Sequence, residues 1–144
     1  MFKKFLPIFV LTIIMMTLLS TTGFADDGIS KKLVTSPITP NWIAISQFSN
    51  TFDISSMGKS TVDSVLYAFS VDKIRIDAYL QQYKNGNWVT IKSWSNTSTD
   101  ISCSISEIWY VEEGYYYRLV TKGTVYRNGV QLEQANYTSD AHWY

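Results

Sequence analysis

The chain of 144 residues predicts an all-β protein, an antiparallel β-sandwich of about seven strands. Three observations indicate this fold class. Apolar residues recur at every second position from Pro40 onward, β-branched and aromatic residues dominate these runs, and short turn-forming segments separate them. No stretch after the leader has the 3.6-residue period of an amphipathic helix. A small β-barrel is the alternative architecture with the same strand pattern.

The first 25 residues have the pattern of a signal peptide. Lys3 and Lys4 precede an uncharged apolar run from Phe5 to Leu19, and small residues follow as far as Ala25. The apolar run is shorter than the about 20 residues of a membrane-spanning helix. We therefore expect cleavage after Ala25, a secreted extracellular product, and no membrane attachment of that product.

The rest of the chain divides into an exposed lead-in, residues 26–39, and a single domain, residues 40–144. Cleavage leaves 119 residues with ten Lys and Arg against twelve Asp and Glu, so the net charge is near −2. This balance gives no overall attraction for nucleic acid. Cys103 is the single cysteine, which excludes an internal disulfide.

The expected strands follow one another at short intervals. They cover residues 42–48, 51–55, 61–71, 73–83, 87–95, 100–107 and 115–122, and a final region covers residues 124–126 and 130–137. The separators "SSMGKS", "KNGN", "SNTST", "EEG" and "RNG" contain the residues that turns require. The pair Asn85-Gly86 tolerates positive φ, and it predicts a tight hairpin between residues 73–83 and 87–95.

Alternation within the strands identifies the expected core. In residues 73–83 one side carries the apolar residues Ile74, Ile76, Ala78 and Leu80, and the other carries Arg75, Asp77, Tyr79, Gln81 and Tyr83. Ile101, Cys103 and Ile105 alternate with serines, so Cys103 is expected to be a buried apolar side chain.

After Gly114, alternation places Tyr115, Tyr117 and Leu119 on one side of a strand. Tyr117 suits a tyrosine corner, in which a buried phenol bonds to the backbone of the preceding connection. Together with the strand number and spacing, this favours a sandwich of the immunoglobulin or fibronectin type III kind.

The predicted hairpin also carries the candidate binding residues. If alternation continues through residues 87–95, Val89 and Ile91 face the core. One outward surface then carries the candidate residues Tyr79, Gln81, Tyr83, Trp88, Lys92 and Trp94, together with Thr90. Aromatic faces stack on sugar rings, and the amide and hydroxyl groups can bond sugar hydroxyls. Two interpretations compete with this hypothesis. In the first, the aromatic pairs only stabilise two paired strands, by under about 1 kcal/mol each. In the second, Trp94 is the core tryptophan of the sandwich.

The sequence offers little for catalysis. The one histidine, His142, lies in a C-terminal segment expected to fray, and a Cys/His or Ser/His pair would need that segment to reach a distant strand. His and Cys are too few for a metal site, and no cofactor is expected. Glu112 and Glu113 precede Gly114 and are expected in a solvated turn. A hydrolase that uses two carboxylates remains the enzymatic alternative.

Three motifs suggest a relationship to other proteins: "GKSTV", "YLQQYKNGNWVTIKSWS" and "EGYYYRLVTKGTVYRNG". They resemble a family of small secreted Gram-positive bacterial proteins of unknown function, in which a Gly-Lys turn, a "YLQ.YKNG.W" hairpin and a "GY.YR" strand occur in this order. The resemblance covers residues 56–129 and implies an extracellular bacterial β-sandwich. It implies no catalytic residue, and "VLYAF" at residues 65–69 is bulkier than the family pattern.

These observations predict a secreted, non-enzymatic β-sandwich that serves as a binding or interaction module. Its expected partner is a glycan of the cell wall or environment, or another protein. The structural alternative is a protein that associates with itself through the aromatic surface, because large apolar patches are often interfaces.

Overall fold

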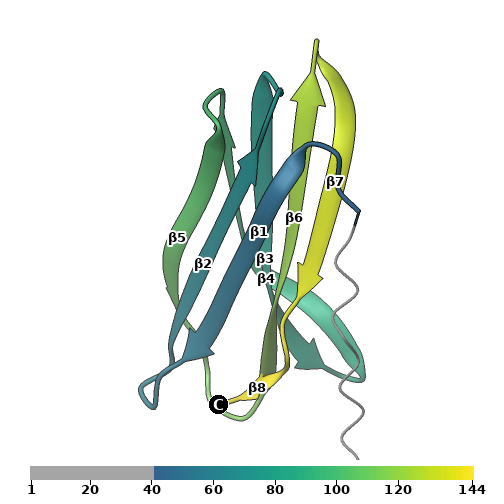
Figure 1. The fold of residues 1–144 in the computed structure, drawn as a ribbon. Helices are drawn as coiled ribbons and strands as arrows, with labels where there is room; N and C mark the ends of the chain where they lie inside the picture. Colours follow the sequence, from purple (N-terminus) through teal and green to yellow (C-terminus); the bar gives the residue numbers. More distant parts are fainter. Residues whose placement is uncertain (1–40) are drawn as a thin grey trace, which may run out of the picture. The chain divides into compact units, whose positions relative to one another are not determined.

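The computed structural model describes residues 41–144, which form two antiparallel β-sheets (Figure 1). The strands are β1 (Ile45–Ile54), β2 (Lys59–Ala68), β3 (Lys73–Lys84), β4 (Asn87–Ser98), β5 (Ser102–Tyr110), β6 (Tyr116–Arg127), β7 (Val130–Thr138) and β8 (His142–Trp143). The predicted signal peptide and lead-in lie outside the described residues. Within residues 41–144 there is no helix of the length and apolar character needed to cross a membrane.

The two sheets divide the strands unequally. The smaller sheet has the order β1-β2-β5, and the larger has the order β4-β3-β6-β7, with β8 paired to the first residues of β6. In Figure 1 the strands β1, β2 and β5 form a layer in front of β3 and β6. This arrangement of residues 41–144 confirms the predicted antiparallel β-sandwich, with two separate sheets in place of a closed barrel.

The core lies between the facing sides of the two sheets. Alternation along each strand places the apolar side chains inward, and the predicted core residues of β3 are all fully buried. The smaller sheet contributes Phe52, Val62, Leu66, Cys103 and Ile105, and the larger contributes Ile74, Ile76, Ala78, Leu80, Tyr117, Leu119 and Val125. The predicted burial of Cys103 is therefore confirmed, and this burial raises the pKa of its thiol.

Tyr117 makes the contact that the sequence predicts for it. Its ring is fully buried, and its hydroxyl donates a hydrogen bond of 2.8 Å to the backbone carbonyl of Glu112, in the connection between β5 and β6. The same hydroxyl accepts a bond of 2.9 Å from the side-chain amide of Gln82 on β3. Tyr117 thus ties the β5–β6 connection to two neighbouring strands of the larger sheet.

Two strands each join two predicted ones, since β1 crosses the predicted break at residues 49–50 and β6 crosses the one at residue 123. β1 runs through Asn50, which points inward and accepts hydrogen bonds of 2.7 Å from the buried hydroxyls of Ser64 and Thr121. β6 runs through Gly123, where the sheets approach so closely that a Cβ atom would overlap the side chain of Leu66. In both strands, contacts across the core allow a residue that local preference would place in a turn.

The predicted fraying of the C-terminal segment is wrong for this structure. β8 pairs His142 with Tyr117 and the following residue with Tyr116. The Tyr144 carbonyl accepts hydrogen bonds from the backbone amides of Gly114 and Tyr115. Local sequence cannot predict this docking, because the partners belong to the β5–β6 connection and to β6.

Candidate functional site

The β3–β4 hairpin forms as its sequence predicts. Asn85 and Gly86 have φ angles of 54° and 79°, which are the two positive values of a tight two-residue hairpin turn. The turn pairs Tyr83 with Trp88, and the rings of these two residues lie 5.2 Å apart between centroids. The hairpin therefore brings two of the predicted site residues into direct contact.

Beyond Thr90, the prediction of one continuous aromatic surface is wrong. Gln81 pairs with Thr90, but Leu80 pairs with Lys92, so a β-bulge occurs at Ile91. Directly paired residues lie on the same side of a sheet, and an extra residue in one strand reverses its alternation from that point.

The bulge separates the six predicted site residues into two groups. Tyr79, Gln81, Tyr83 and Trp88 lie on the outer side of the larger sheet, and Lys92 and Trp94 lie opposite the core residues Leu80 and Ala78. The bulge has an evident physical reason, because Ile91 and Trp94 are three residues apart and an unbroken strand would bury only one of them. Both pack against the core in this structure.

Lys92 and Trp94 instead close the side of the sandwich where β4 approaches β5. The Lys92 ammonium lies 4.5 Å from the ring centroid of Trp109 on β5 and 5.8 Å from that of Trp94. The Asn96 amide donates a 2.7 Å hydrogen bond to the carbonyl of Ser104, which links the edges of the two sheets. The interpretation of Trp94 as a core tryptophan therefore agrees with its position better than a role on an open surface.

On the outer side, β6 adds an arginine to the four remaining residues. The guanidinium carbon of Arg118 lies 4.3 Å from the ring centroid of Trp88, and its Nε donates a 2.8 Å hydrogen bond to the side-chain oxygen of Gln81. The Gln81 amide in turn lies 3.3 Å from the hydroxyl of Thr90. We call the surface formed by Tyr79, Gln81, Tyr83, Trp88, Thr90 and Arg118 the Trp88 face.

The Trp88 face combines the groups that a polar, ring-shaped ligand requires. Tyr83 is 41% exposed, and Trp88 and Tyr79 are partly exposed. The contacts with Gln81 and Trp88 fix the position of the Arg118 guanidinium before any ligand arrives, which lowers the entropy cost of binding. The arrangement offers aromatic surface, amide and hydroxyl groups, and one cation within three adjacent strands.

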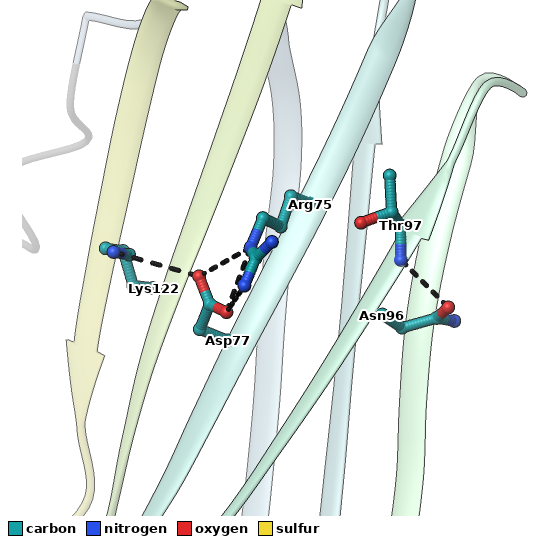
Figure 2. A network of polar contacts seen from close by, with 5 residues as sticks. All are labelled: Arg75, Asp77, Asn96, Thr97 and Lys122. Atoms are coloured by element: carbon teal, nitrogen blue, oxygen red, sulfur yellow. Dashed lines mark hydrogen bonds and ion pairs between the residues drawn. The ribbon is translucent and has the colours of Figure 1, made fainter.

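Further along the same side, charged residues form a compact network (Figure 2). Asp77 is only 6% exposed, and Arg75 donates to its carboxylate through Nη2 at 2.7 Å and through Nε at 3.0 Å. The Lys122 ammonium lies 3.7 Å from the other carboxylate oxygen. Hydrogen bonding from Arg75 lowers the pKa of Asp77 below its usual value, although burial acts in the opposite direction. Two cations thus share one carboxylate.

The described residues offer no evident centre for metal binding. Residues 41–144 contain no group of three or more His, Cys, Asp or Glu side chains that could hold an ion. His142 packs edge-on against Phe52 and lies 3.9 Å from the Asp53 carboxylate. Glu112 and Glu113 are exposed in the β5–β6 connection, as the sequence predicts.

A concave feature lies away from the predicted site residues. An open depression of about 570 Å³ is lined by Ser56, Glu113, Gly114, Trp143 and Tyr144. Its wall depends on the docked C-terminal segment. None of the residues of the Trp88 face lines it, so the two features are separate.

Comparison with known proteins adds no family assignment. No protein-family model matches the chain, and a search of curated proteins finds no match. The resemblance to small secreted bacterial proteins stays a prediction, and the functional interpretation depends on the residues themselves.

Arg118 is the residue of the Trp88 face that the sequence prediction missed. The alternation that places Tyr117 and Leu119 inward also places Arg118 outward, so its exposure was predictable. Its position beside Gln81 requires β6 to be the neighbour of β3, and this pairing joins residues 37 positions apart. No local pattern in the sequence indicates it.

Proposed function

We propose that the protein is a secreted, non-catalytic binding module with an immunoglobulin or fibronectin type III-like fold, whose ligand is an extracellular glycan. The Trp88 face carries this proposal. It joins partly exposed aromatic rings with a hydrogen-bonded row of Arg118, Gln81 and Thr90. Aromatic rings that stack on the apolar patches of sugars, beside polar groups that bond sugar hydroxyls, give the combination of contacts that such ligands need.

Two features support the fold assignment within this proposal. The division into β1-β2-β5 and β4-β3-β6-β7 fits a seven-stranded sandwich of this kind, in which neighbouring sheets contain strands from both halves of the chain. The bond from Tyr117 to the Glu112 carbonyl has the geometry of a tyrosine corner. Secretion is supported by the leader pattern of residues 1–25.

Charge on the larger sheet opposes self-association through the same surface. The outward positions of β3 and β6 carry Lys73, Arg75, Arg118 and Lys122 against one acid, Asp77. This side therefore has a net charge of +3. A symmetric dimer would place this positive surface against an identical copy, and the repulsion would weaken it.

The proposal is tested by retention of the purified protein on insoluble cell wall and on a panel of polysaccharides. We expect a Tyr83→Ala, Trp88→Ala double variant to lose at least about tenfold in affinity, the equivalent of about 1.4 kcal/mol. The matched control is Tyr110→Ala, which removes a 69% exposed aromatic ring from the smaller sheet and should leave retention unchanged.

Circular dichroism and a thermal melt establish that each variant is folded. Equal retention of the wild type and the folded double variant on every polysaccharide would contradict the proposal. If the wild type sediments as a dimer and the double variant sediments as a monomer, the results would favour self-association through this surface instead.

A further inference from the structure

The larger sheet presents a concentration of positive charge that the composition of the whole chain conceals. The outward positions of β3 and β6 sum to +3, and those of β1, β2 and β5 carry Asp53, Asp63 and Lys59, a sum of −1. The sandwich therefore has sides of opposite charge. A net charge taken over the chain averages the two sides and removes this difference.

The cations on the larger sheet are not equivalent. Arg75 and Lys122 share the carboxylate of Asp77. Lys73 lies 4.0 Å from the ring centroid of Tyr126. Arg118 forms no ion pair with a carboxylate in the part of the chain that the structure describes, and its Nε bonds the neutral amide oxygen of Gln81.

The contacts of Arg118 leave its terminal nitrogens for a ligand. The ring of Trp88 supports the guanidinium plane and Gln81 holds Nε, while neither Nη atom donates to another described residue. A guanidinium presents paired donors whose geometry matches a carboxylate. A fixed guanidinium without an internal counter-ion is thus a preorganised site for an anionic group.

We infer that the glycan is an acidic polysaccharide, and that a carboxylate on one of its sugar rings binds Arg118. This inference rests on the proposed function. Arg118 and Lys122 follow each other on the outer side of β6 at a distance of four residues, roughly 13 Å along the strand. A polymer with repeated negative charges can engage Arg118 beside the aromatic rings and extend toward the positively charged network at Asp77.

The test compares an acidic polymer with the same polymer after methyl esterification, which removes the negative charge of each carboxylate and adds a methyl group. We would titrate the protein with polygalacturonate and with the same polymer after methyl esterification, and with alginate and hyaluronate as further acidic polysaccharides. Arg118→Gln is expected to lose about tenfold or more in affinity for the acidic polymers, because a hydrogen-bonded charge is removed. Arg118→Lys keeps the charge but not the paired donors, and should bind with intermediate affinity.

The control variant is Lys59→Gln, which removes a positive charge from the smaller sheet and should leave affinity unchanged. Affinity of the wild type should fall with rising salt, and Arg118→Gln should show a weaker salt dependence. Thermal melts of every variant confirm folding before the affinities are compared.

Two sets of results would overturn the inference and leave the proposed function standing. One is equal affinity of the wild type for the charged and the esterified polymers. The other is an affinity of Arg118→Gln for the acidic polymers that equals that of the wild type. In either case, Trp88→Ala must still lose binding. Failure to bind any of the three acidic polysaccharides, or equally tight binding of single-stranded DNA, would also overturn it. A folded Trp88→Ala variant that binds every ligand like the wild type would refute the proposed function itself.

Discussion

Replacing Tyr117 by phenylalanine measures how much its hydroxyl hydrogen bonds, which join the β5–β6 segment to the larger sheet, contribute to stability. The ring stays, so no cavity forms, and only the hydroxyl is lost. That hydroxyl donates to the Glu112 carbonyl and accepts from Gln82. Glu112 is exposed, and water can bond its carbonyl in the variant. Gln82 is 8% exposed, and its amide would lose its partner.

The cost follows from this difference in exposure. A buried donor left without a partner costs about 1 to 3 kcal/mol, and the solvated carbonyl adds little. We therefore expect Tyr117→Phe to lower the free energy of unfolding by about 2 kcal/mol. For a domain of this size, the melting temperature should fall by about 8 to 16 °C.

Thermal and urea denaturation, followed by circular dichroism, measure this change. The urea m-value should stay constant, because the surface area exposed on unfolding does not change. Tyr67→Phe is the control, since the Tyr67 hydroxyl bonds no other described residue and its ring is 41% exposed. Adding Gln82→Met to Tyr117→Phe should restore most of the lost stability, because it removes the unpaired amide. Equal melting temperatures for Tyr117→Phe and Tyr67→Phe would refute the reasoning.

Three further predictions concern the core and the charged groups. Gly123→Ala should destabilise the fold by about 1 to 3 kcal/mol in urea unfolding, because a methyl group would overlap Leu66; an unchanged midpoint would contradict the close approach. Trp94→Ala should lower the melting temperature and leave polysaccharide retention intact, whereas loss of retention in a folded variant would restore Trp94 to the site. Hydrogen bonds from Arg75 lower the pKa of Asp77. Burial acts to raise the pKa of Glu133 on β7, but hydrogen bonds from the backbone amides of Ile45, Ile43 and Ala44 outweigh it and lower this pKa below its usual value. Both carboxylates thus stabilise the fold above their unfolded pKa values of about 4, and this stability should be lost as pH falls through the lower folded values. Urea midpoints measured from pH 7 to pH 2 test this, and an Asp77→Asn, Glu133→Gln variant should show a flatter acid limb than the wild type.

Local sequence patterns were sufficient to predict the strands and turns and most of the core residues. The two-residue period placed Ile74, Ile76, Ala78 and Leu80 inward, and Asn85-Gly86 located the hairpin. Both patterns act over a few residues, so they need no knowledge of the partner strand. Tyr117 was also predictable, because its bond reaches only five residues back along the chain.

Only the tertiary structure decided which residues form the candidate site. The bulge at Ile91 allows both Ile91 and Trp94 to pack against the same core, and it moves Lys92 and Trp94 away from the outer side. Arg118 joined the site because β6 pairs with β3, and the positive charge became visible once alternation was combined with that pairing. The sequence by itself therefore determined a β-sandwich with an aromatic hairpin, since short-range periodicity specifies strands and turns. The composition of the Trp88 face required the fold, because strand register and neighbouring strands are set by contacts between distant residues.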